Sequence, residues 1–356
     1  MNKFNLFFSA AALLLLAGVT QAQVFMVVTA GESPTSTPYD NLETAVQNAE
    51  AGSTVYIPTG EHVIAGSPEI AGSPRATTLL IDKPLNLIGA GSGEGTQHNS
   101  VIRGHVAVTA DAGGSVFEGI SIFITTSNGN LYLDGLSNFL LKRCIVGGNV
   151  YLSGKGDGNI FRECQFYYIQ GTVSFYGSAG FNTDVSVYTK VMMQNCVLTY
   201  GIYSLRGAVL SNNVIADNSA PFAYVQNSLI ANNIFTYNGN IATNYNYTTG
   251  NTWSYNLFVG DFNTTADNSY DHNITGEAIA DVFETSPPSD GKYRLKEGGP
   301  ATAAGSDGTD LGIYGSMAPA REQRIPSVPS VTEFIVSGVS APDGKLPVKI
   351  TVEVQE

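Results

Sequence analysis

Charged side chains near the middle of the chain recur at equivalent positions of repeated segments. Glu118, Arg143 and Glu163 form one row, and Lys142 and Arg162 form a like-charged pair in the row beside it. An enzyme that eliminates across an acidic sugar must neutralise the uronate carboxylate, commonly with Ca²⁺, and remove a proton with Arg, Lys, His or Tyr. Arg143 and Arg162 are the candidate catalytic residues for this chemistry. The alternative is a solvated ladder of ion pairs with no further role.

Tyrosine is concentrated in the second half of the chain. Twelve of the 18 Tyr lie between Tyr167 and Tyr270, together with the single Trp, Trp253. Exposed rings in a row, with Asn and Asp between them, can stack on sugar faces and bind hydroxyl groups. Alternatively, the rings stack on one another as cross-strand ladders. The predicted ligand-binding residues are Tyr168, Tyr200, Asp217 and Tyr237, at equivalent positions of successive repeats, and Tyr245 and Tyr247 in a loop.

The repeat that places these side chains begins near residue 110. Each copy carries a small or amide residue, here called the anchor, with an apolar or aromatic side chain three positions before it. Most copies carry another apolar residue two positions after the anchor. Successive anchors are about 22 residues apart on average. The anchors are Gly119, Cys144, Cys164, Cys196, Asn213, Asn233, Asn256 and Asn273.

The spacing within each copy predicts a coil of a solenoid. Apolar positions five apart cannot face one side of an uninterrupted strand, so the chain must bend near the anchor. Stacked parallel coils place like residues about 4.8 Å apart. The four Asn anchors are then expected to form a ladder of amide hydrogen bonds, and the three Cys a stack of buried thiols without a redox or metal role. A Cys144–Cys164 disulfide is also geometrically allowed.

The first 22 residues have the pattern of a signal peptide. Lys3 gives a positive start, residues 6–19 are apolar, and Ala22 ends a short segment suited to cleavage. No second long apolar run follows, so we expect an exported protein, outside the cell or on its surface, with no transmembrane segment. The net charge of −13 repels phosphate backbones, and nucleic acid is therefore not an expected partner.

Elements outside the repeats are expected to close the ends of the solenoid. Asp40 is predicted to cap a short amphipathic helix beginning at Leu42, and strands are predicted over residues 53–58, 79–81 and 85–89. Residues 310–315 are interpreted as a last coil, which places the solenoid at residues 23–318. Residues 319–356 comprise a Pro-containing linker and a β-hairpin, which serves as a cap for the final sheet edge or as a surface-attachment element.

The segments STVYIPTG, NLIGAG and DLGIYG, together with the Asn-anchored repeats, resemble the pectin-lyase-like superfamily of right-handed parallel β-helix proteins over residues 24–315. The resemblance implies three sheets with a binding groove along one of them. The superfamily includes lyases, glycoside hydrolases, adhesins and non-catalytic members. The Arg-rich motif of its pectate lyases is missing, and of the polygalacturonase motifs only Asn182-Thr183-Asp184 is matched. A leucine-rich repeat is the rival fold, although the later repeats lack its Leu pattern.

These observations together predict an all-β, right-handed parallel β-helix with a short N-terminal capping helix and a C-terminal β-hairpin. The first functional hypothesis is an exported, non-catalytic protein that binds a polysaccharide, a surface glycan or another cell-surface component without a metal or cofactor. The second is a polysaccharide lyase acting on uronates, with Ca²⁺ as its cofactor, and this is favoured over a glycoside hydrolase. The third is a structural surface spacer.

Overall fold

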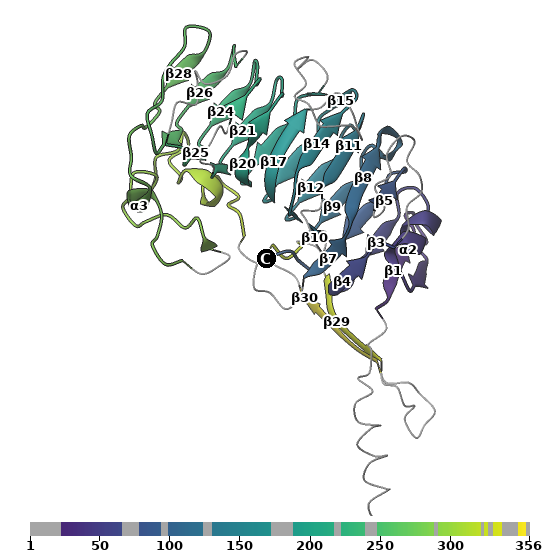
Figure 1. Cartoon of the computed structure of the whole chain (residues 1–356). Helices are drawn as coiled ribbons and strands as arrows, with labels where there is room; N and C mark the ends of the chain where they lie inside the picture. Colours follow the sequence, from purple (N-terminus) through teal and green to yellow (C-terminus); the bar gives the residue numbers. More distant parts are fainter. Residues whose placement is uncertain are drawn as a thin grey trace, which may run out of the picture.

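The computed structural model describes most of the chain after residue 22. The described residues are 23–65, 78–93, 99–123, 130–171, 188–216, 222–238, 248–287, 291–321, 324–326, 330–336 and 348–353. The predicted signal peptide, residues 1–22, lies outside them. The prediction of an all-β chain with long parallel sheets is confirmed, because two large sheets of 12 and 14 strands contain nearly all the described strands (Figure 1).

Each coil contributes short strands to as many as three rows, and equivalent strands of successive coils pair in parallel. The first row is β3 (Thr54–Tyr56), β6 (Asn86–Ile88), β9 (Val116–Glu118), β12 (Leu140–Lys142), β16 (Ile160–Arg162), β19 (Met192–Gln194), β21 (Val209–Ser211), β24 (Leu229–Ala231), β26 (Thr252–Ser254) and β28 (Ser269–Asp271). The second row is β4 (Gly60–Val63), β7 (Ser100–Arg103), β10 (Ile120–Phe123), β13 (Ile145–Val146), β17 (Gln165–Gly171), β20 (Val197–Tyr203), β22 (Val214–Ile215), β25 (Ile234–Phe235) and β27 (Leu257–Phe258).

The third row shares β17 and β20 with the second, because these two strands are long enough to span both rows. It also contains β5 (Thr78–Ile81), β8 (His105–Thr109), β11 (Leu131–Asp134), β14 (Val150–Ser153) and β23 (Phe222–Ala223). A separate small parallel pair is formed by β15 (Gly156–Asp157) and β18 (Tyr188–Thr189), and η1 (Ala110–Ala112) is a short 3-10 helix. This arrangement is compatible with a β-helix solenoid.

The N-terminal end of the solenoid is closed by antiparallel strands and a helix. The strand β1 (Phe25–Val28) pairs with both β2 (Ser36–Tyr39) and β3, and α2 (Leu42–Asn48) buries Leu42, Ala45 and Val46. The helix is predicted correctly, but its cap is not Asp40. The Asn41 side chain accepts a hydrogen bond from the Thr44 N–H at 2.8 Å, which makes Asn41 the N-cap. Glu43 is then the second helical residue, one position too early for a capping box, and its carboxylate accepts a hydrogen bond from the Ala65 N–H.

The core of the repeats is a column of inward-facing side chains at the centres of the first-row strands from β9 to β26. All are at most 1% exposed, and equivalent residues are in register. They are Phe117, Leu141, Phe161, Met193, Leu210, Ile230 and Trp253. The register corrects one anchor: Lys142 pairs with Glu118 and Ile145 with Ser121, so the residue equivalent to Cys144 is Ile120 rather than Gly119.

The predicted asparagine ladder is confirmed. The Asn213 backbone N–H and side-chain amide both donate to Asn233 Oδ1 at 2.9 Å, Asn233 donates in the same way to Asn256, and Asn256 to Asn273. Each side-chain amide also donates to a backbone carbonyl of the preceding coil, such as Leu210 for Asn233. The ladder therefore provides partners for the buried polar groups of the bend, coil after coil.

A second ladder lies at the bend that precedes the first-row strands, and the sequence interpretation missed it. Asn268 Oδ1 accepts from the Asn251 N–H, and Asn251 Oδ1 accepts from the Ser228 N–H. Ser228 Oγ in turn accepts from the Ala208 N–H, and Asn159 Oδ1 from the Phe139 N–H. At both bends of the later coils, a side-chain oxygen thus accepts a hydrogen bond from a backbone N–H of the preceding coil.

Residues 310–315, interpreted above as a last coil, belong to neither large sheet. The chain leaves the solenoid after β28, forms the short helix α3 (Ile279–Val282), and returns along the flank (Figure 1). Leu311 and Ile313, in and beside the 3-10 helix η3 (Gly312–Tyr314), pack with Val282 against the outward side chains of the second row. The buried outward residues beneath them are Val197, Val214, Ile234 and Leu257. We call residues 305–326 the return arm.

The predicted C-terminal hairpin is present, but it does not extend the final coil. The strands β29 (Ser330–Val336) and β30 (Val348–Glu353) pair antiparallel and form a separate two-stranded sheet. Among the described residues neither strand pairs with β28, the last strand of the first row. The hairpin therefore does not continue the first-row sheet, and both of its expected roles, as a cap and as a surface-attachment element, stay predictions.

The asparagine ladder predicts a large stability loss at one position. In the variant Asn233→Ala, Asn213 loses its side-chain acceptor and Asn256 loses a donor, both inside the protein. We expect the free energy of unfolding to fall by about 2–3 kcal/mol, measured by urea denaturation. Asn263→Ala, at an exposed position, is the control and should change it by less than about 0.5 kcal/mol. Equal effects of the two changes would contradict a structural role for the ladder.

Candidate functional site

Two tyrosine rings stack on the outer side of the second row. Tyr167 and Tyr200 have ring centroids 4.9 Å apart and planes inclined by 25°, and Tyr167 is 38% exposed. The register of β17 and β20 shifts between Phe166 and Tyr168, and Tyr168 therefore pairs with Gly201 instead of Tyr200. This irregularity puts Tyr167, not the predicted Tyr168, beside Tyr200.

The other predicted ligand residues are not gathered at this pair in the described structure. Tyr237 is half-buried and packs against the main core. The Tyr168 side chain, Asp217, Tyr245 and Tyr247 lie outside the described residues. Of the predicted ligand residues whose side chains the structure describes, Tyr200 belongs to the stacked pair and Tyr237 does not.

A second aromatic column lies on the third row and was not predicted. The Tyr132 and Tyr151 rings are stacked at 5.2 Å with an angle of 11° between their planes. The Asn130 and Asn149 side chains donate to their hydroxyl groups at 3.0 and 2.6 Å. The twice-repeated sequence Asn-x-Tyr, with the Tyr outward between inward apolar residues, is the signal that could have revealed it.

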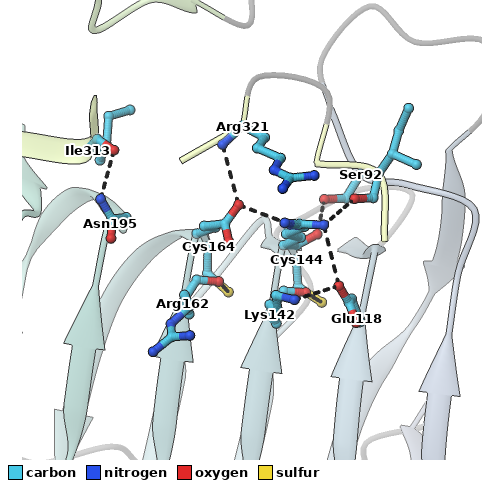
Figure 2. Close-up of polar contacts among 12 residues, drawn as sticks. Ser92, Glu118, Lys142, Cys144, Arg162, Cys164, Asn195, Ile313 and Arg321 are labelled. Carbon is cyan, nitrogen blue, oxygen red and sulfur yellow. Dashed lines mark hydrogen bonds and ion pairs between the residues drawn. The ribbon is translucent and has the colours of Figure 1, made fainter. Parts of the chain in front are cut away.

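Arg143, one of the two catalytic candidates, is a buried structural cation. Its side chain is 4% exposed, and its Nε donates to Glu163 at 3.0 Å. Its Nη1 donates to the Ile325 carbonyl of the return arm at 2.8 Å and lies 3.7 Å from Glu118 (Figure 2). The expectation of a solvated ion ladder is wrong here, because the return arm covers the row. A guanidinium held in this way cannot reach a polysaccharide.

The return arm binds a column of side chains at the bend. The Arg321 N–H donates to Glu163, and the Asn195 amide donates to the carbonyls of Ile313 and Gly315 at 2.8 and 3.1 Å (Figure 2). Asn232 exchanges two hydrogen bonds with Ser306, both 3.0 Å long. Side chains of successive coils therefore fix the return arm in place, mainly through hydrogen bonds to its backbone.

Arg162, the other catalytic candidate, faces outward from the first row. It pairs in register with Lys142, whose Nζ lies 3.1 Å from Glu118. The predicted like-charged pair is therefore present. Arg162 is half-buried, and its Nε has no hydrogen-bond partner among the described residues. Of the predicted catalytic pair, only this residue is placed where it could contact an acidic ligand.

The three cysteines form the buried stack that was expected. All are free and 0% exposed, and the Sγ atoms of Cys164 and Cys196 lie 3.4 Å from the carbonyls of Leu141 and Phe161. These carbonyls occupy the position that accepts the Asn amides in the later coils. Burial raises the pKa of the Cys144 thiol to about 12, so the thiol is neutral at physiological pH.

Three acidic side chains lie at or near the last coil of the solenoid. Asp261 and Asp267 are exposed, and Asp271 pairs with His272 at 2.6 Å. Within the described ranges, no three side chains of His, Cys, Asp or Glu are grouped to hold a metal ion. In the same part of the chain, no helix is long and apolar enough to cross a membrane.

The buried network predicts that Arg143 fastens the return arm. Arg143→Met should leave the Glu163 carboxylate buried without its cation and should lower the free energy of unfolding by about 3–5 kcal/mol. Trypsin should then cleave faster after Arg321 and Arg324, detected by mass spectrometry. Lys190→Met, which breaks an exposed ion pair with Asp157, is the matched control, with an effect below about 1 kcal/mol. Unchanged proteolysis of the arm in Arg143→Met would contradict this assignment.

The thiol column predicts inert cysteines in the folded protein. A disulfide-exchange reagent should modify none of the three thiols in the native state and all three in denaturant, as counted by absorbance. Because folding raises the Cys144 pKa from 9.0 to about 12, unfolding is favoured once the thiolate can form. Stability from this group should be complete below pH 9 and decline between about pH 9 and 12. Rapid native-state labelling would show that the thiols are accessible.

Comparison with family models and with curated proteins found no match to this chain. The likeness to pectin-lyase-like proteins rests on the sequence motifs and on the parallel sheets alone.

Proposed function

We propose that the chain is an exported, right-handed parallel β-helix of the pectin-lyase-like type that binds extracellular glycans without acting on them. The stacked pair Tyr167 and Tyr200 is the observation that carries the proposal. Tyr167 is exposed beside a sheet irregularity, and an exposed aromatic ring can stack on the apolar face of a sugar. Parallel strands joined by crossovers are right-handed in nearly all proteins, which supports the handedness.

The signal-peptide pattern supports placement outside the cell or on its surface. The burial of Arg143 supports a binding protein over an enzyme, because it removes one of two candidate catalysts from contact with any substrate. The proposed binding, by aromatic stacking, uses no metal or cofactor. The hairpin β29–β30 forms a sheet separate from the two large sheets in the described structure, which supports surface attachment as its proposed role.

The aromatic pair should be required for binding. Tyr167→Ala with Tyr200→Ala should weaken binding to soluble plant, algal and bacterial polysaccharides by about tenfold or more, because each exposed ring contributes stacking and buried area. Affinity electrophoresis measures this. Tyr56→Ala, a half-buried Tyr near the N-terminal end, is the control and should bind normally. Full binding by the double variant, or no retardation by any polysaccharide, would overturn the proposal.

A lyase acting on uronates is the second candidate function, favoured by the outward cations Lys142 and Arg162 on neighbouring strands. Such an enzyme would release products with an unsaturated uronate, which absorb ultraviolet light. The wild-type protein and Arg162→Ala can be incubated with uronate polymers, with and without Ca²⁺. Product formation lost in Arg162→Ala would establish the lyase; no product from any polymer would eliminate it.

A further inference from the structure

In the column of bend residues, aromatic side chains replace asparagine at the last two coils. These residues lie between the first and second rows and have positive φ: Gly119, Arg143, Glu163, Asn195, Asn212, Asn232, Tyr255 and His272. Arg143, Glu163, Asn195 and Asn232 bind the return arm, as described above. No hydrogen bond joins Tyr255 or His272 to the described part of that arm, so binding the arm does not explain these two residues.

Tyr255 and His272 also sit in an unfavourable backbone conformation. Their φ angles are 53° and 49°, in a region that Asn tolerates and that bulky side chains rarely adopt. Asn occupies the same position in three earlier coils. Strained residues of this kind concentrate at functional sites, where another requirement outweighs the backbone cost.

The two rings make a flat platform at the end of the solenoid. Their centroids are 4.8 Å apart and their planes differ by 5°, with the His272 side chain 64% exposed. His272 Nδ1 lies 2.6 Å from Asp271 Oδ1. This contact places a proton on Nδ1 and orients the ring, leaving Nε2 available to a hydroxyl group.

A shallow concavity of about 220 Å³ adjoins this platform. Its lining includes Phe262, Tyr270, Asp271, His272 and Asn273. The aromatic rings belong to the end of the core, because Phe262 stacks on Phe258 at 4.0 Å and Tyr270 packs against Phe262 at 5.3 Å. The concavity therefore combines an apolar wall with a carboxylate, an imidazole and an amide, and it is sized for one small ring.

The charge of this region restricts the ligand. Residues 207–291 contain no Lys or Arg, whereas Asp261, Asp267 and Asp271 lie at the last coil. An anionic group would be repelled here, while uncharged hydroxyls can bond the carboxylate and the imidazole. We propose that Tyr255, Asp271, His272 and the adjoining concavity form a terminal binding site for a single neutral sugar ring. The site uses residues separate from Tyr167 and Tyr200.

The single Trp of the chain can report on this site through Phe262, which lines the concavity. Trp253 is buried with its ring centroid 5.4 Å from that of Phe262, and its strand pairs with β28. Methyl glucoside, methyl galactoside and N-acetylglucosamine are the probes, followed by Trp253 fluorescence and by saturation-transfer NMR. We expect at least one of them to bind with millimolar affinity and to shift the emission.

Substitution by the residue of the earlier coils separates binding from folding. Tyr255→Asn with His272→Asn should weaken sugar binding about tenfold through loss of the stacking faces, while the melting temperature stays the same or rises. Tyr200→Ala should leave this response intact, so the outcome is independent of the glycan site proposed above. Unchanged sugar binding in the double Asn variant, or no response to any of the three probes, would overturn the proposal.

Discussion

The in-register stacking of one coil on the next is the constraint on which every other feature depends. Parallel pairing satisfies the strands, but each bend leaves buried N–H groups without a backbone partner. Asn256 Oδ1 accepts both the N–H and the side-chain amide of Asn233, and the same exchange joins Asn233 to Asn213. Each bend is thus completed by a side chain of the following coil. Stability consequently propagates between neighbours, as in other one-dimensional repeat proteins.

The same bend explains why the return arm, which is not part of the repeats, can bind along the flank of the solenoid. A left-handed residue before each anchor turns its side chain away from the core, and stacking aligns these side chains in a column. Arg143, Glu163, Asn195 and Asn232 then hold the return arm through its backbone and a serine. Because the arm crosses several coils, it ties together units that otherwise contact only their neighbours.

Local patterns predicted the coils, the inward residues and the Asn ladder, because these follow from periodicity and register. The sequence patterns assigned the wrong anchor in one coil. Gly119 occupies the left-handed position directly before the anchor, and because it is small like the other anchors it was aligned with them in place of Ile120. The burial of Arg143 could not be predicted, since its arm partner Ile325 is 182 residues away. The sequence predicted Tyr168 in place of Tyr167, because the repeat pattern contains no signal of the irregularity that shifts the register between β17 and β20.

Aromatic residues in a row usually either stack on one another or bind a ligand. In a solenoid the same row can do both, because its rings stack within the column while a ring at a break or an end can contact a ligand. Within a regular column each ring covers the faces of its neighbours, as Tyr132 and Tyr151 do. A face becomes available to a sugar only where the column is interrupted or ends. Tyr167 and Tyr200, where glycan binding is proposed, stack beside the register shift between β17 and β20, and His272 lies at the end of its column. Breaks in the repeat are therefore where recognition is expected, while its regular parts supply the rigid support.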